Sequence, residues 1–165
     1  MLNKKQAKEY ARLLKQTFEM VKITTDGMHE LNVFNQDCEM LFNTLTTEFG
    51  FWLDNKDVLS LADPKLKDIR TLLKQMGVLI HEQTAYQTTT MSLSYRFNDY
   101  MREFLEYQVA VAAPDATKTF IDEATLKIAK TLEGISEEIT LNNYNYIDHC
   151  NKLAAYKNIH SRNKN

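Results

Sequence analysis

The feature that most constrains the fold is a strict heptad pattern in the last third of the chain. Two sets of residues recur every seven positions: Ile121, Ile128, Ile135, Asn142, His149 and Tyr156, and Thr125, Leu132, Ile139, Tyr146, Leu153 and His160. Apolar residues with an average spacing of 3.5 form one narrow stripe on an α-helix, and another helix must cover it. We therefore expect a helix over about 116–160 that packs like a coiled coil, either within the chain or against a second copy.

Helix-breaking residues are scarce, with four Gly and two Pro among 165 residues. Strands and their turns normally need more of both, so the chain is predicted to be all-α. Pro64 follows Asp63, which is typical of an N-cap and first helical position, and Pro114 ends the next segment. We expect one domain, 1–165, folded as an elongated antiparallel bundle of helices at about 3–48, 64–112 and 116–160. The alternative is a larger number of shorter helices.

The first predicted helix carries an apolar stripe that changes position near its middle. The stripe is Ala7, Tyr10, Leu14, Phe18, Val21, Thr25 and Met28, and it continues one residue out of step as Leu31, Phe34, Cys38, Leu41 and Leu45. Such a slip indicates either an irregularity in one long helix or a break at 24–27. We favour the single helix.

The second predicted helix has a polar centre. Its early stripe is Leu66, Ile69, Leu73, Met76 and Ile80, and its late stripe is Leu93, Phe97, Tyr100, Met101 and Phe104. Continuing the early stripe would place Gln83, Gln87, Thr90 and Ser94 inside. This segment therefore predicts a gap in the bundle or a bend near Gly77 or 88–90.

An apolar cluster surrounds Gly50 at the start of the predicted connection, 49–63. It contains Phe49, Phe51, Trp52 and Leu53. Removing each of these side chains from water is worth about 1.5–3 kcal/mol. We expect them to plug the end of the bundle, or else to form a docking surface for a partner.

Composition excludes several classes of protein. Apolar residues make up 44% and charged residues 25%, and neither a membrane-spanning run nor a signal peptide is apparent, so we expect a cytoplasmic chain. The net charge of −2 argues against nucleic-acid binding. Both ends are nevertheless basic, which suggests an anionic membrane surface as an alternative partner. The basic residues are Lys4, Lys5, Lys8, Arg12, Lys152, Lys157, Arg162 and Lys164.

Motifs for catalysis and cofactor binding are absent from the sequence. It contains no Glu-x-x-His, His-Glu-x-x-His, Gly-x-Gly-x-x-Gly or Cys-x-x-Cys, and we predict neither an enzyme nor a bound cofactor. A metal held by Cys38, His81 and His149 across helices is a second alternative, although no ligand spacing supports it. His149, like Asn142, is expected to be a polar stripe residue that sets the register of packing.

Residues between 41 and 107 follow a family pattern. They include Gly77, Gln83, Ala85, Leu93, Asp99, Tyr100 and Arg102, preceded by the phenylalanine-glycine stretch at 49–53. This pattern resembles the second helix of sorting-nexin-type BAR domains. The resemblance implies three long helices, dimerisation and binding to curved anionic membranes. The chain departs from the family in its smaller size, in Pro114 and in its acidic middle.

Taken together, these patterns predict a non-enzymatic helical module that acts by protein–protein interaction, including association with a second copy, in a scaffold or assembly role. BAR-like or peripheral membrane binding is the first alternative, and a helical metal or small-ligand sensor is the second. The residues expected to carry the interaction are Phe49, Phe51, Trp52, Ile128, Leu132, Ile135, Ile139, Asn142 and His149.

Overall fold

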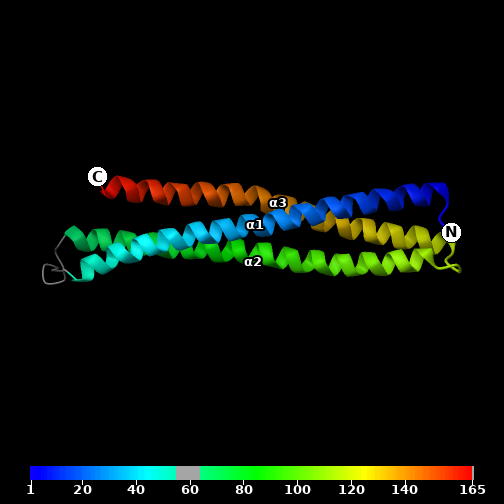
Figure 1. The fold of residues 1–165 in the computed structure, drawn as a ribbon, viewed down its shortest axis with the longest axis horizontal. Coiled ribbons are helices and arrows are strands. Elements are labelled where there is room, and N and C mark those ends of the chain that lie inside the picture. Colours follow the sequence, from blue (N-terminus) through cyan, green and yellow to red (C-terminus); the bar gives the residue numbers. More distant parts are fainter. Residues whose placement is uncertain (55–63, 165) are drawn as a thin grey trace. The chain divides into compact units, whose positions relative to one another are not determined.

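The chain folds into three long helices. The computed structural model describes residues 1–54 and 64–164, except for the side chains of 48–49, 51–54, 64–69, 72 and 156–164. The helices are α1 (Lys4–Asp54), α2 (Pro64–Ala112) and α3 (Lys118–Lys164), and the described ranges contain no strand (Figure 1). The predicted all-α bundle of three helices is confirmed. Each helix is uninterrupted, so the alternative of more, shorter helices is wrong.

The helix ends follow local side-chain chemistry. At α1, the Asn3 side chain accepts a hydrogen bond from the Gln6 backbone N–H at 2.9 Å, and Gln6 Oε1 accepts one from the Asn3 backbone N–H at 3.0 Å, which is a capping box. At α3, Thr117 Oγ1 accepts a hydrogen bond from the Phe120 N–H at 3.1 Å. These side chains satisfy donors that the first helical turn leaves without a partner.

The predicted connection at 49–63 begins too early. Residues 49–54 belong to α1, which ends at Asp54 rather than near 48. This stretch contains one glycine, Gly50. A single glycine inside a helix costs only about 1 kcal/mol relative to alanine, so it does not end α1. Residues 55–63 lie outside the described residues. At the other end of the chain, α3 continues to Lys164 instead of ending near 160.

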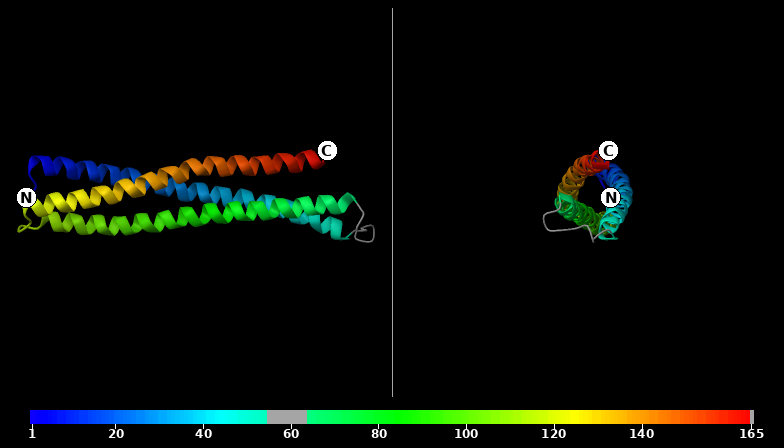
Figure 2. Two further views of the ribbon diagram at one scale, coloured as in Figure 1. Left: turned by 180° about the vertical axis from the view of Figure 1, so that it is seen from behind. Right: turned by 90° about the vertical axis from the view of Figure 1, so that its left-hand side faces the viewer.

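Contacts between Cα atoms divide the chain into two compact units, and each unit contains a piece of every helix. Unit 1 comprises Met1–His29 and Thr89–Tyr144, and unit 2 comprises Glu30–Thr88 and Asn145–Asn165. Within each unit the piece of α2 runs opposite to the pieces of α1 and α3 (Figures 1 and 2). The division crosses all three helices, so no linker in the sequence marks it.

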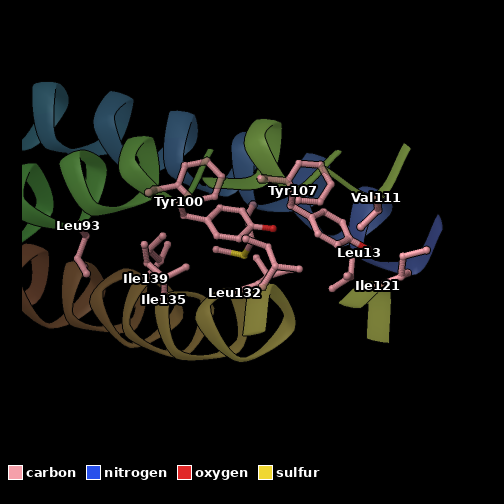
Figure 3. Packing of buried hydrophobic residues seen from close by; sticks show 13 residues of the cluster. Leu13, Leu93, Tyr100, Tyr107, Val111, Ile121, Leu132, Ile135 and Ile139 are labelled. Atoms are coloured by element: carbon pink, nitrogen blue, oxygen red, sulfur yellow. The ribbon is translucent and has the colours of Figure 1, made fainter. Parts of the chain in front are cut away.

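The core of unit 1 is a cluster of aliphatic and aromatic side chains from all three helices. Figure 3 shows Leu13 from α1, Tyr100 from α2, and Leu132 and Ile135 from α3 within this cluster. The rings of Tyr100 and Phe104 stack with their centroids 6.0 Å apart, and those of Phe97 and Tyr100 stack at 5.8 Å. Burial of such side chains provides most of the driving force for packing the three helices together.

The buried stripe of α1 corrects the predicted one. Ala7, Phe18 and Thr25, assigned to the stripe by sequence, are exposed, and Phe18 retains 67% of its accessible surface. The buried positions are Gln6, Leu13, Thr17, Met20, Gly27, Leu31, Phe34, Cys38, Leu41 and Leu45. Successive buried positions are three, four or seven residues apart throughout, so the predicted slip at Met28 does not exist. The prediction failed because polar residues occupy core positions in the first half.

The other two helices differ in how well their stripes were predicted. In α2, Leu73 and Ile80 of the predicted early stripe are exposed, whereas Met76 is half-buried and Leu79 is buried. The side chains of Leu66 and Ile69 lie outside the described residues. Tyr86 and Thr90 are buried within the polar centre, and α2 stays helical there without a break. In α3 most of the predicted heptad positions are buried: Ile121, Ile128, Leu132, Ile135, Ile139, Asn142 and Leu153. Thr125, Tyr146 and His149 are half-buried, and the side chains of Tyr156 and His160 lie outside the described residues.

Candidate functional site

Five of the six predicted interaction residues of α3 lie inside unit 1, and the sixth, His149, lies in unit 2. Ile128, Leu132, Ile135 and Ile139 are all buried among side chains of the same chain. Asn142 is buried beside them, and its Nδ2 donates a hydrogen bond to Thr90 Oγ1 at 3.0 Å. Association of two chains through this stripe would therefore require unit 1 to open.

A second buried polar contact in unit 1 joins α1 to α2. Thr17 Oγ1 donates to the Leu13 carbonyl at 2.7 Å and lies 2.7 Å from the Tyr100 hydroxyl. Because the threonine proton is used by Leu13, the tyrosine is the donor in the second contact. Burial raises the pKa of the Tyr100 phenol. Each of the two hydroxyls therefore has a hydrogen-bond partner within the chain, as buried polar groups generally do.

His149 belongs to a polar and aromatic cluster in unit 2. Its Nδ1 lies 2.9 Å from Glu82 Oε2, and Lys152 Nζ donates to the same carboxylate at 3.3 Å. The imidazole ring lies 4.9 Å from the ring of Tyr86 and 6.0 Å from that of Phe34. The histidine thus packs against aromatic rings on one side and pairs with a carboxylate on the other, as expected of a polar residue at a stripe position.

Tyr146 extends this cluster in unit 2. Its ring lies 5.8 Å from that of Tyr86. Burial raises the pKa of the Tyr146 phenol strongly, and its hydrogen bond with Cys150 and the nearby charge of Glu30 act in the same direction. The surroundings of the phenol therefore favour its protonated, hydrogen-bonding form.

The remaining residues proposed from the sequence are the possible metal ligands and the apolar cluster around Gly50. Cys38 is buried and His81 is exposed, and the described residues contain no group of three or more His, Cys, Asp or Glu that could hold a metal ion. Phe49, Phe51 and Trp52 lie in α1, but their side chains lie outside the described residues. Their predicted role as a plug or docking surface stays a prediction.

A groove on the outside of unit 1 was not predicted. It runs between α1 and α3 and comprises a hollow of about 1030 Å³ and an adjoining one of about 570 Å³, which share Arg12, Leu126 and Ala129. A third, of about 390 Å³, shares Ser136 and Glu137 with the second and is lined by α3 alone as far as Tyr144. We call the first two hollows the α1/α3 groove.

The floor of the α1/α3 groove is apolar and its two edges differ in charge. Ala11, Thr125, Ala129 and Ser136 leave space because their side chains are small, and Leu126 retains 58% of its accessible surface there. Along the α1 edge the charged residues are Lys5, Lys8, Glu9, Arg12 and Lys15. Along the α3 edge they are Asp122, Lys130, Glu133 and Glu137. The α1 edge is therefore net basic and the α3 edge net acidic.

Only some of the charged residues at the two edges have a partner within the chain. Arg12 forms an ion pair with Glu9 on the same helix, and Gln6 Nε2 donates to Asp122 Oδ1 at 3.0 Å. In contrast, Lys5, Lys8 and Lys15 form no ion pair with any residue that the structure describes. Three basic side chains thus stand beside an apolar floor, available to a charge from outside the chain.

The sequence contains a repeat among the residues that line the groove, although only the structure shows that these residues come together. Residues that line the groove repeat every seven positions: Lys8 and Lys15 on the α1 edge, and Leu126 of the floor with Glu133 of the edge on α3. Charged heptad edges of this kind commonly govern the pairing of helices between chains. Three of the basic residues assigned to a membrane surface by sequence, Lys5, Lys8 and Arg12, line this groove.

Comparison with known proteins adds no relative: no family model, curated protein or solved structure matches the chain. The resemblance to BAR domains therefore stays a prediction. In the part of the chain that the structure describes, no helix has an apolar stretch long enough to cross a membrane.

Proposed function

We propose that this chain is a non-enzymatic helical module that acts by packing its helices against another protein, including a second copy of itself, in a scaffold or assembly role. The observation that carries the proposal is the α1/α3 groove, which offers an apolar floor between two charged edges. Helix surfaces of this composition suit another helix, because the small residues admit its side chains and the edges select its charges.

The arrangement of the polar side chains supports the same function. Asn142 bonds to Thr90, Thr17 to Tyr100, and His149 to Glu82. Each pair lies within one unit and joins two helices, so these side chains specify the packing of the bundle. Exposed apolar surface beside a polar rim, in contrast, is a common mark of a protein-binding site.

A pair of matched variants tests this function. Leu126→Arg places a charge on the groove floor, whereas Leu105→Arg changes a leucine of α2 that is equally exposed, at 57%, and does not line the groove. We expect wild-type chain and the Leu105→Arg control, immobilised at equal density, to retain the same protein from a cell extract. The Leu126→Arg chain should retain about tenfold less, which is a loss of about 1.4 kcal/mol.

Two results would contradict the proposal. One is a wild-type chain that is strictly monomeric by light scattering and retains no protein at all. The other is equal retention by the wild-type chain and both variants, which would remove the groove as the observation that carries the function.

The gathering of Lys5, Lys8 and Lys15 on one edge favours one second candidate, peripheral binding to an anionic membrane. Each such lysine near an anionic bilayer contributes about 1 kcal/mol. We expect this candidate to show co-sedimentation with vesicles of anionic phospholipid, no co-sedimentation with zwitterionic vesicles, and loss of binding on Lys5→Glu, Lys8→Glu and Lys15→Glu substitution. Absence of co-sedimentation with the anionic vesicles would exclude it.

A further inference from the structure

We infer that the α1/α3 groove is covered by the same groove of a second copy, with a two-fold axis running along it so that α1 of each chain lies on α3 of the other. This inference rests on the proposed function and names the partner. The argument depends on the charges of the two edges and on the alignment of α1 with α3.

The charges of the edges select the direction of the axis. A two-fold axis along the groove places the basic α1 edge of one chain on the acidic α3 edge of the other, and does so twice. An axis across the groove would instead place α1 on α1, so that Lys5, Lys8 and Lys15 of the two chains would face one another. Complementary edges suppress the wrong orientation because like charges brought together are costly.

The alignment of α1 with α3 can be read at two places in unit 1. Gln6 Nε2 donates to Asp122 Oδ1 at 3.0 Å and to the Lys118 carbonyl at 3.5 Å, and a Cβ added at Gly27 would lie 3.4 Å from Asn143 Oδ1. These pairs are 116, 112 and 116 residues apart in sequence. Residues of α1 in this unit are therefore level, to within about one helical turn, with the residues of α3 numbered 116 higher.

A two-fold axis parallel to the helices preserves these levels and brings complementary residues together. Leu126 is level with residue 10, so it would lie beside Ala11 of the other chain and fill the space that the small side chain leaves. Lys15 is level with residue 131, only two residues from Glu133. At a rise of about 1.5 Å per residue, that offset is about 3 Å, well within the reach of a lysine side chain.

Charge reversal on each edge separately provides the test. The basic-edge variant carries Lys5→Glu, Lys8→Glu and Lys15→Glu, and the acidic-edge variant carries Glu133→Lys and Glu137→Lys. Residues that bond within the chain, Arg12 and Asp122, are left unchanged. The matched control, Glu103→Lys with Glu106→Lys, reverses two exposed acids of α2 that do not line the groove.

Sedimentation equilibrium of each protein, and of an equimolar mixture of the two edge variants, gives the dimerisation constant. We expect a wild-type dimer, an unchanged control, and a dimer weakened on the order of a hundredfold in each edge variant, because several opposite-charge contacts become like-charge contacts. In the mixture, both α1/α3 contacts of a heterodimer are complementary. One joins the two reversed edges, and the other joins the two unchanged edges. We therefore expect the two variants to form a heterodimer more readily than either forms a homodimer.

Each other result overturns the inference in a recognisable way. A wild-type dimer that neither edge variant weakens would leave self-association intact but place its interface elsewhere. Weakened variants that do not recover in the mixture would exclude the two-fold axis along the groove. A wild-type monomer at every concentration would overturn the inference, and the retention experiment with Leu126→Arg would then decide the proposed function by itself.

Discussion

At the scale of single residues, the buried hydroxyl of Thr17 illustrates how a polar side chain can occupy a core position. It donates to the Leu13 carbonyl one turn earlier and accepts from Tyr100 on α2, both at 2.7 Å. The two bonds satisfy the hydroxyl, so its burial carries little of the cost of an unpaired polar group.

Removal of either partner should have unequal effects. Thr17→Val leaves the buried Tyr100 hydroxyl without its acceptor and should destabilise the chain by about 1–3 kcal/mol. Tyr100→Phe should cost less, because Thr17 keeps its bond to Leu13. Urea unfolding of both single variants and the double variant measures this, and the double variant should be more stable than the sum of the single effects predicts. Strict additivity would mean that the two hydroxyls do not interact.

Buried tyrosines also predict a loss of stability at alkaline pH. Burial raises the pKa of the Tyr100 and Tyr107 phenols above the ordinary value of about 10. Above pH 10 the unfolded chain releases these protons while the folded chain keeps them, so the free energy of unfolding decreases as the pH rises further. Below pH 10 both states are protonated and the stabilisation is complete.

This alkaline loss can be measured by following tyrosinate absorbance and helicity together. We expect part of the tyrosine to ionise only as the helical signal disappears, and we expect a chain carrying Tyr100→Phe and Tyr107→Phe to lose less stability between pH 10 and 12. Ionisation of all eight tyrosines near the ordinary value, with helicity unchanged, would show that the phenols are not buried.

At the scale of the helices, the position of the α1 stripe is the sharpest departure from the sequence-based prediction. Leu13 is fully buried, whereas Phe18, which the apolar pattern favours, retains 67% of its accessible surface. Leu13→Ala should therefore cost about 2–5 kcal/mol of stability, as truncation of a buried leucine does. Phe18→Gln should change stability by no more than about 0.5 kcal/mol.

Thermal or urea unfolding of these two variants distinguishes the observed stripe from the predicted one. The predicted stripe requires the opposite order, with the larger loss at Phe18. Alanine and glutamine are better helix formers than the leucine and phenylalanine they replace, by less than about 0.7 kcal/mol each, so helix propensity cannot account for a large loss at either position.

The difference between the three helices explains how much of the fold the sequence could predict. In α3 the core positions Ile128, Leu132 and Ile135 are apolar, so periodicity alone identifies them. In α1 the core positions include Gln6 and Thr17, whose partners on other helices are invisible in the sequence. The apolar pattern therefore predicted a stripe on the neighbouring side of α1, with a slip that the structure does not have.

The polar centre of α2 shows a related effect. Tyr86 lies in the core of unit 2, with its ring 5.2 Å from that of Phe34 and 4.9 Å from that of His149. One large aromatic side chain maintains the packing where the sequence shows mostly polar residues, so α2 continues without the predicted bend. The helix ends at Pro64 and Pro114 were predictable because proline acts locally.

The groove could not be predicted, since its two edges come from α1 and α3, more than one hundred residues apart in sequence. Lys8 with Lys15, and Leu126 with Glu133, are ordinary heptad-spaced pairs when each helix is considered alone. Their meaning depends on the packing of α1 beside α3 with an offset of 116 residues. Single-sequence periodicity contains no information about that offset.

At the scale of the whole molecule, the heptad stripes and the groove have different roles. Among the residues that the structure describes, the buried stripe positions of the three helices pack within one chain and hold each unit together. The groove lies on the surface of unit 1 and combines exposed Leu126 with charged edges, so it is the surface on which association with a second chain is proposed. On this proposal, folding and association depend on different residues and can be changed separately.

Cross-linking between two differently labelled chains tests the proposed pairing of α1 with α3 most directly. One chain carries Ala11→Cys and the other Leu126→Cys, and the linked peptides are mapped after mild oxidation of the mixture. We predict that links from position 11 of one chain to position 126 of the other predominate. Links from 11 to 11, or no link between chains at either position, would contradict the pairing of α1 with α3 across two copies.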